Sequence, residues 1–161
     1  MPTDSLKIQM EGIDQMIVNL EKLGTRVAAR GPNAAVRAGG SVIIKEMRRR
    51  APKDTGSLKK SIGQKLKVYR RDQTVVSIVG ARSKRYDTPK GRRNPAIYAH
   101  LIERGVRPHR LGRRGATHPG VPRRPFMRPA WDAAAPRARQ AVIDKLSEVF
   151  AKEAQSIAAA S

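Results

Sequence analysis

The chain has 161 residues, and its 34 Lys and Arg against 13 Asp and Glu give it a formal net charge of +21. That length suits one domain, residues 1–161, and the absence of cysteine excludes disulfides, thiolate metal sites and a cysteine nucleophile. No apolar run approaches the roughly 20 residues that a membrane-spanning helix needs, so we expect no membrane contact.

The first 50 residues predict a short strand and two helices. Alternating apolar residues from Leu6 to Met10 favour a half-buried strand. Apolar residues at helical spacing from Ile13 to Val27 predict a first helix, and Gly31-Pro32-Asn33 is expected to end it. A long second helix, whose small residues allow close approach to a neighbour, then runs from Asn33 to about Arg50. Pro52 stops it, because the residue before a proline avoids helical geometry.

The next segment predicts a turn followed by an antiparallel hairpin. In Asp54-Thr55-Gly56 the Asp side chain can bond nearby amides, and the glycine accepts positive φ. Period-two alternation from Ile62 to Tyr69 and the β-branched run from Val75 to Val79 predict two strands, with Arg70 to Gln73 as their connection. Because both strands have a polar face, we expect an antiparallel sheet covered by helices on one side.

Two more helices are predicted beyond the sheet. Pro95 to Arg104 favours a short helix, stopped by the glycine that follows it. The run from Pro125 to Pro129 is expected to be extended, since two prolines fix φ. A C-terminal helix from Ala130 to about Ala158 follows, with Pro136 kinking or restarting it and residues 155–161 fraying. The chain is therefore predicted to be α+β, with an antiparallel sheet packed by an N-terminal helix, a long second helix and a C-terminal helix.

Positive charge is concentrated between Arg82 and Arg128, where fourteen Lys and Arg face only Asp87 and Glu103. The same stretch is rich in Pro and Gly, so residues 82–96 and 106–124 are expected to be extended basic loops, partly disordered before a partner binds. Arginine predominates there, and its guanidinium can pair bidentately with phosphate or carboxylate groups. A polyanion or an acidic protein surface is the expected partner, although a solvated loop without a partner explains the same composition.

No residue pattern in the chain supports catalysis, a metal or a cofactor. The histidines (His100, His109 and His118) do not form a ligand set with metal-site spacing. Acidic residues are too sparse for general acid–base work or for the divalent cations of a nuclease. We therefore expect no enzymatic activity. Motifs for sequence-specific nucleic-acid readout are also missing, which leaves nonspecific phosphate contact open.

Three clusters, in this order, resemble the head–tail connector or tail-completion (neck) proteins of long-tailed bacteriophages. The first is Ala51 to Leu58 followed by Lys60-Ser61-Ile62, the second is Tyr98 to Glu103 followed by Gly105, and the third is Arg124 to Asp132. The chain departs from the family pattern after the glutamate, where members usually carry an aromatic residue and then Gly-Thr. Here Arg104-Gly105-Val106 takes that place. The basic insertion that follows, up to Arg124, is longer than is typical of the family.

The resemblance implies an α+β subunit that assembles as a homo-oligomeric ring, expected to be hexameric, at the junction of the capsid portal complex and the tail tube. A tail-completion or terminator role is favoured, without catalysis or cofactor. The implied partners are the portal-side head-completion and tail-tube proteins, with DNA in the channel as a further contact. The implied location is the virion neck, reached after assembly in the host cytoplasm. The alternative is a nonspecific nucleic-acid-binding accessory protein.

The motif residues are expected to maintain the fold: Pro52, Asp54, Thr55, Gly56, Leu58, Tyr98, Glu103, Gly105, Pro125, Phe126 and Pro129. The expected partner contacts are the arginines of the basic insertion: Arg107, Arg110, Arg113, Arg114, Arg123 and Arg124. Two roles stay open for Phe126, which could anchor the final helix or fill a pocket of a neighbouring subunit.

Overall fold

The structure is a computed structural model that describes residues 13–72, 74–89, 91–111 and 115–160. The strand predicted from Leu6 to Met10 lies outside these residues. In chain order the elements are α1 (Ile13–Arg50), α2 (Ser57–Ser61), β1 (Ile62–Tyr69), β2 (Thr74–Ala81), α3 (Pro95–Arg104), β3 (His109–Leu111), β4 (Ala116–His118) and α4 (Met127–Ala158). The α+β class is confirmed. Within the described part of the chain, no helix is long and apolar enough to cross a membrane.

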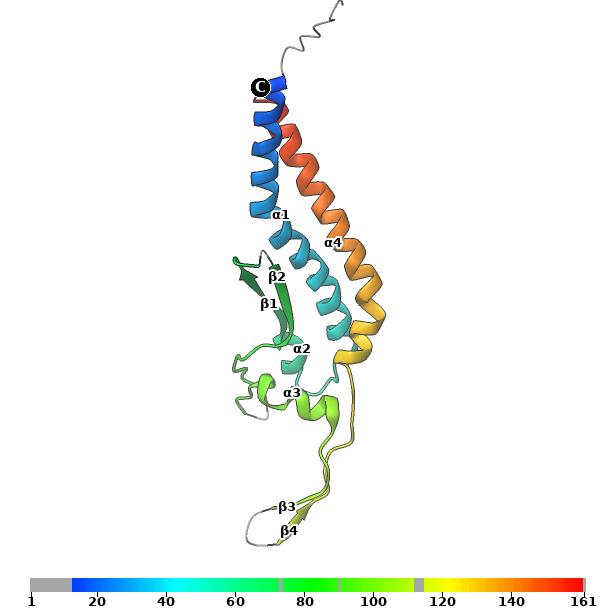
Figure 1. The fold of residues 1–161 in the computed structure, drawn as a ribbon. Helices are drawn as coiled ribbons and strands as arrows, with labels where there is room; N and C mark the ends of the chain where they lie inside the picture. Colours follow the sequence, from blue (N-terminus) through cyan, green and yellow to red (C-terminus); the bar gives the residue numbers. More distant parts are fainter. Residues whose placement is uncertain (1–12, 73, 90, 112–114, 161) are drawn as a thin grey trace, which may run out of the picture.

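α1 is one continuous helix of 38 residues, so the predicted break at Gly31-Pro32-Asn33 is wrong. A proline inside a helix costs about 3 kcal/mol, because it removes one hydrogen bond and crowds the preceding turn. Packing against α4 continues across this point, since Leu146 of α4 lies against Gly31 and Ala35 is buried one turn later. Tertiary packing therefore outweighs the local signal, and Figure 1 shows α1 changing direction about its middle.

α4 begins at Met127, inside the run that was expected to be extended. Pro129 occupies the third helical position, where an N–H group would have no partner within the helix, so proline is tolerated there. The helix continues through Pro136 to Ala158, and it includes residues 155–158 of the segment that was expected to fray.

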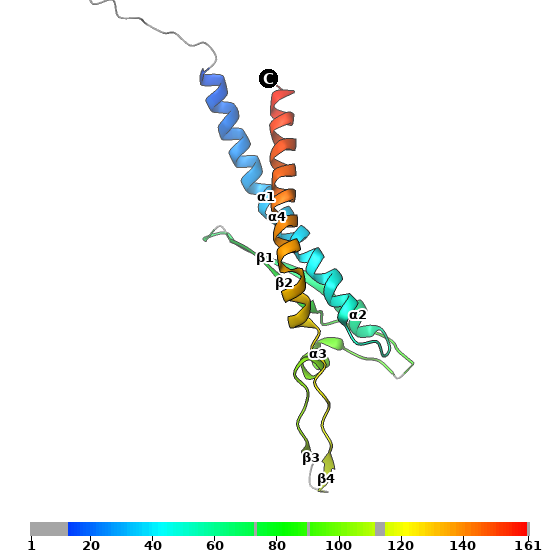
Figure 2. The same ribbon diagram turned by 90° about the vertical axis from the view of Figure 1, so that its right-hand side faces the viewer.

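α1 and α4 pack side by side over much of their lengths (Figures 1 and 2). Gly39 makes the closest approach possible, because a Cβ atom there would lie 2.6 Å from Cγ2 of Val142 and 3.0 Å from the carbonyl oxygen of Ala138. Near the far end of the helix pair, Glu153 accepts a hydrogen bond of 3.3 Å from Arg30. Small residues and this ion pair hold the two helices together.

β1 and β2 form an antiparallel hairpin whose register runs from Ile62 opposite Ala81 to Tyr69 opposite Thr74. One face of the hairpin packs on α1, where Gln64 donates a hydrogen bond of 3.2 Å to the carbonyl oxygen of Arg37. The sheet with one helix-covered face is therefore confirmed. Figure 1 shows α1 between the sheet and α4, which gives three layers.

The main core lies where α2, α3 and the first turn of α4 meet the end of α1 and the start of β1. Its buried members include Met47, Leu58, Ile62, Phe126 and Ala130. This core fixes the position of the motif clusters.

Within residues 106–124, expected to be an extended loop, residues 106–111 pair antiparallel with residues 116–121. We call residues 106–121 the basic arm. The backbone groups of Val106 and Val121 exchange two hydrogen bonds of 2.9 Å at its base, and β3 pairs with β4 beyond them. Prolines and glycines flank these strands without interrupting them, which explains why a Pro/Gly-rich composition still allows pairing. The arm projects away from the body at the end opposite the C-terminus (Figures 1 and 2).

Candidate functional site

The first motif cluster forms the turn between α1 and the sheet. Gly56 has a φ of 73°, as the predicted turn requires, and Leu58 directly after it is buried in the core. The hydroxyl oxygens of Thr55 and Ser57 lie 2.8 Å apart, and that of Ser57 lies 3.0 Å from the hydroxyl of Tyr98 on α3. This hydrogen-bond chain joins the first cluster to the second.

An open cavity of about 440 Å³ lies beside this turn, at the base of the basic arm. Its walls come from the first cluster, α3 and the arm, and they include Pro52, Asp54, Thr55, Tyr98 and Val121. The cavity therefore borders the motif residues as well as the charged insertion.

Glu103 joins the second cluster to the third by capping α4. Its Oε2 atom accepts hydrogen bonds from the N–H groups of Phe126 (2.7 Å) and Met127 (2.9 Å), and Oε1 accepts one from Arg128 (3.0 Å). Pro129 has no N–H group, and the N–H of Ala130 makes the first bond within the helix, to Phe126. Every N–H group at the start of α4 thus has a hydrogen-bond partner. The negative charge of the carboxylate also interacts favourably with the positive end of the helix dipole.

The electrostatics of Glu103 agree with this role. Burial on its own would raise the pKa of the carboxyl group, but the three backbone hydrogen bonds, with the nearby charge of Arg123, lower the pKa below its usual value of 4.5. Glu103 therefore stays ionised and keeps its hydrogen bonds at neutral pH.

Gly105 ends α3 and lets the arm return past it. Its φ of 75° lies in the left-handed region, and its N–H group donates to the carbonyl oxygen of Leu101. A Cβ atom at this position would lie 2.9 Å from the carbonyl oxygen of Val121, on the returning strand of the arm. The predicted helix stop is confirmed, and the structure adds a steric reason for glycine.

Phe126 is buried inside the subunit, with only 1% of its surface exposed. It belongs to the same core as Ile62, Ala99 and Ala130. The side chain therefore anchors the start of α4, and it is not available to fill a pocket of a neighbour. Pro125, directly before it, is exposed.

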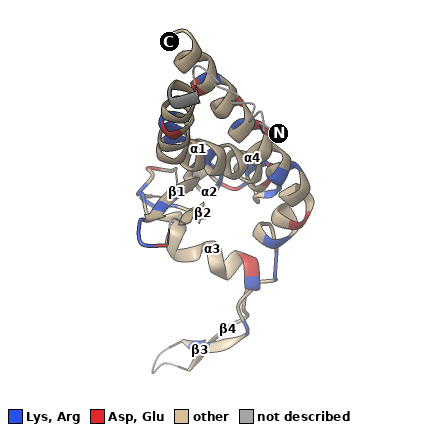
Figure 3. Ribbon diagram, turned by 45° about the horizontal axis from the view of Figure 1, so that its top comes forward, with Lys and Arg blue, Asp and Glu red and all other residues tan. Residues whose placement is uncertain are grey.

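The predicted contact arginines cluster on and beside the basic arm. Arg107 lies exposed just before β3, and Arg110 lies exposed on it. Arg123 and Arg124 lie exposed after Val121, where the chain leaves the arm. Arg113 and Arg114 lie outside the described residues. From Arg104 to Trp131 the sequence has no Asp or Glu, and Figure 3 shows basic residues and no acidic ones along the described part of the arm.

The arm also brings together two histidines that the sequence placed apart. His109 and His118 are cross-strand partners, and their rings stack with centroids 5.1 Å apart. Their symmetric placement in the sequence about Gly112 to Gly115 was the signal that could have paired them. Within the described ranges no group of three or more His, Cys, Asp or Glu side chains could hold a metal ion.

A second feature escaped the sequence analysis, the burial of Glu46 among arginines near the end of α1. Its carboxylate accepts hydrogen bonds from Arg49, and Nε of Arg50 donates to it at 2.7 Å. These bonds, from Arg49 first and then Arg50, lower the pKa of Glu46 to about 2 despite the opposing effect of burial. The i, i+3 and i, i+4 spacing along the helix was a visible signal for this cluster.

Comparison with known proteins identifies the family. The sequence model described as "Bacteriophage HK97-gp10, putative tail-component" matches residues 14–105, more than half of the chain. The chain therefore belongs to the HK97-gp10-like family, and with it to the structural components of the bacteriophage virion. Searches of curated proteins and of solved structures give no significant match.

The matched region has a clear structural meaning. It runs from the start of α1 to Gly105, and so includes the first two motif clusters and the sheet. The basic arm and α4 follow it. What the arm contacts is therefore inferred below from its own chemistry.

Proposed function

We propose that this protein is a tail-completion subunit of a long-tailed bacteriophage. Several copies, six by expectation, form a ring at the head–tail junction, where the ring joins the portal-side head-completion proteins to the tail tube. The subunit assembles in the host cytoplasm, remains in the virion neck, and works through binding alone, without a catalytic step. Membership of a phage tail-component family supports the structural part of this proposal.

The observation that carries the proposal is the basic arm and its attachment. The arm projects from the body, has exposed arginines on both sides of its base, and contains no acidic residue. Its base is held firmly, because Val106 pairs with Val121 and the N–H of Arg124 donates to the carbonyl oxygen of Ile102 at 2.9 Å. A cationic extension on a rigid base is suited to docking against acidic surfaces of adjacent neck proteins, where charge complementarity speeds association.

The arm can be tested by removing its charge. We expect Arg110→Ser, Arg113→Ser and Arg114→Ser together to lower the yield of joined heads and tails about tenfold in a complementation assay, because docking loses its electrostatic steering. The purified variant should keep the wild-type unfolding free energy, since none of the three residues is a member of the core.

A matched control removes the same charge from the body, by Lys53→Ser, Lys59→Ser and Lys60→Ser at three exposed positions. We expect nearly normal yields from that control. Wild-type yields from the arm variant, or equal losses from both variants, would contradict a specific role of the arm.

Contact with DNA is the second candidate, because an arginine-rich arm without carboxylates can also bind phosphates. Nonspecific binding of this kind weakens steeply with salt. The logarithm of the binding constant falls linearly with the logarithm of the salt concentration, with a slope of about −0.9 for each phosphate neutralised. The variant with Arg110→Ser, Arg113→Ser and Arg114→Ser distinguishes docking on acidic proteins from binding to DNA. Strong duplex binding at moderate salt that the variant loses would favour DNA over acidic protein partners.

A further inference from the structure

The basic arm is held together by few contacts. At its base Val106 and Val121 exchange two backbone hydrogen bonds of 2.9 Å, and beyond them β3 and β4 pair over three residues. All three residues of β3 and two of the three in β4 are exposed, so the paired segment has no core beneath it. A segment with few buried contacts opens at a low free-energy cost, and a single side-chain contact can then decide whether it stays paired.

The histidine pair, His109 and His118, adds side-chain contacts to this segment. The two rings stack with their centroids 5.1 Å apart. Nδ1 of His118 accepts a hydrogen bond of 3.0 Å from the N–H group of Gly120, so that nitrogen carries no proton and the ring is neutral. Nδ1 of His109 lies 3.1 Å from the carbonyl oxygen of Arg107, which can only accept, so this nitrogen is the donor.

The N–H group of Gly120 is held where the two strands of the arm approach each other closely. Gly120 has a φ of 86°, and a Cβ atom there would collide with the carbonyl oxygen of Val106. A backbone shift that moved this N–H group away from His118 would therefore disturb the neighbouring pair of Val106 and Val121. When His118 takes up a proton on Nδ1, two N–H donors face each other and the hydrogen bond is lost.

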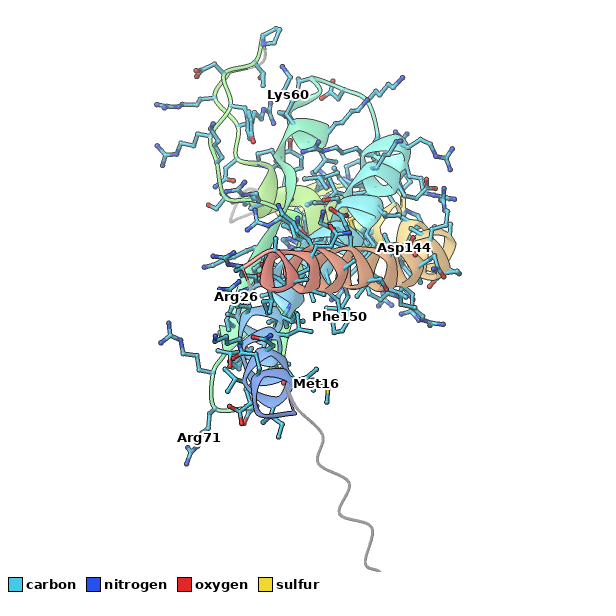
Figure 4. All side chains as sticks on the ribbon, turned by 90° about the horizontal axis from the view of Figure 1, so that it is seen from above. Met16, Arg26, Lys60, Arg71, Asp144 and Phe150 are labelled. Carbon is cyan, nitrogen blue, oxygen red and sulfur yellow. The ribbon has the colours of Figure 1, made fainter. Side chains whose placement is uncertain are left out.

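No carboxylate in the described arm offsets the charge that a proton adds to the histidine pair. The arm projects away from the body (Figures 1 and 2), so the charged groups that can face the rings are its own, Arg107 and Arg110. The body differs in this respect. Arg26, for example, lies beside α4 (Figure 4), 3.9 Å from a carboxylate oxygen of Glu153. A protonated ring in the arm therefore meets only like charges.

We propose that the histidine pair makes the order of the arm depend on pH. While His118 is neutral, its hydrogen bond to Gly120 and the stacked rings keep β3 and β4 paired. Histidine side chains as a class change charge between about pH 5 and pH 8. As the pH falls through that range, His118 loses its hydrogen bond, the rings and the arginines repel one another, and the strands separate beyond Val106 and Val121. The stabilising contact is thus complete at the upper end of the range and is lost toward the lower end.

A pH-dependent arm changes the free energy of docking. A paired arm holds its arginines in fixed positions, whereas an open arm must lose conformational freedom when it binds. Opening of the arm is measured on the purified chain, so the result does not depend on the role proposed at the head–tail junction.

The absence of cysteine allows the arm to be spin-labelled at chosen positions. Leu111→Cys and Ala116→Cys place two nitroxide labels on exposed cross-strand partners without changing any charge. Electron paramagnetic resonance then reports the separation of the labels, and dilution with unlabelled chain removes signals between copies. We expect close labels at about pH 8 and an open fraction about tenfold larger at about pH 5, because one hydrogen bond is lost and repulsion is added. Circular dichroism should show the same helix content at both pH values.

The variant His118→Asn, made in the labelled chain, identifies the group responsible. The side-chain oxygen of Asn takes about the place of Nδ1, so it can accept from the N–H group of Gly120, and it does not titrate. We expect this variant to stay paired at both pH values. The matched control is His100→Asn, at an exposed histidine of α3 outside the arm, and it should open in acid as the wild type does.

The contrary outcomes are distinct. Equal separation of the labels at both pH values in the wild type would show that the histidine pair does not control the arm. Acid opening that persists in His118→Asn, or that His100→Asn abolishes, would place the effect on other groups. A loss of helix content over the same range would show that acid acts on the whole subunit and not on the arm. Each of these results would overturn the proposal.

Discussion

At the scale of single residues, Glu103 links α3 and the start of the arm to the first turn of α4, which is more than 20 residues away in sequence. It lies on α3, next to the start of the arm, and it binds the first N–H groups of α4. The sequence identified Glu103 through its motif but gave no indication of this role, because an N-cap is normally sought directly before the helix it caps. Here the capping carboxylate comes 23 residues earlier in the chain than Phe126.

The variant Glu103→Gln tests this capping role. An amide oxygen cannot replace a carboxylate that accepts three hydrogen bonds, so we expect the free energy of unfolding to fall by about 1–3 kcal/mol. Chemical denaturation monitored by circular dichroism measures this change. The control Glu148→Gln, at an exposed residue that forms a surface ion pair with Lys145, should change stability by less than about 0.5 kcal/mol. Equal effects of the two variants would contradict the capping role.

The same residue predicts a pH dependence with a definite sign. The pKa of Glu103 is lower in the folded state than its usual value of 4.5, so its stabilising contribution is complete above that pH and is lost as the pH falls. Glu46, with a pKa of about 2, acts in the same direction. Stability of the wild type should therefore decline below about pH 4.5, and the decline should be smaller in Glu103→Gln. A steeper decline in the variant would contradict the assignment.

At the scale of elements, sequence patterns located most helices and strands but misjudged where three segments begin, end or pair. The strands of the first hairpin and the helix from Pro95 to Arg104 follow from periodicity and a glycine stop, which are local signals. The helix break predicted at Pro32 is wrong, because the packing of α1 on α4 outweighs the free-energy cost of a proline inside the helix. The strands of the arm were missed because the composition of this segment is typical of a loop. Cross-strand pairing depends on which residues face each other, and composition does not show that.

Two glycines in α1 test the packing of the helix pair with the same substitution. Nothing lies within 4 Å of a Cβ atom at Gly24, so Gly24→Ala should raise stability by about 0.5–1 kcal/mol through helix propensity. At Gly39 the new methyl group would collide with Val142, so Gly39→Ala should lower stability by about 1–3 kcal/mol. Thermal and chemical denaturation measure both. The same sign for both variants would contradict close packing of α1 on α4 at Gly39.

At the scale of the whole molecule, net charge is distributed unevenly. The basic arm extends from one end of the body (Figure 1). Residues 13–31 of α1 and 140–158 of α4 lie at the other end, and their five basic and five acidic residues cancel in formal charge. The excess of positive charge on the arm suits a surface that docks on acidic partners. The family match describes a phage tail component, and the sequence alone predicted that class from the order of three short motifs.

The central claim is that this subunit acts at the head–tail junction, and its position in the virion tests that claim most directly. A short epitope tag after Ser161 can be detected with gold-labelled antibody on intact particles by electron microscopy. We predict label at the neck, between the capsid and the tail tube. Label along the tube, at the distal tip of the tail, or on no part of the virion would contradict the account.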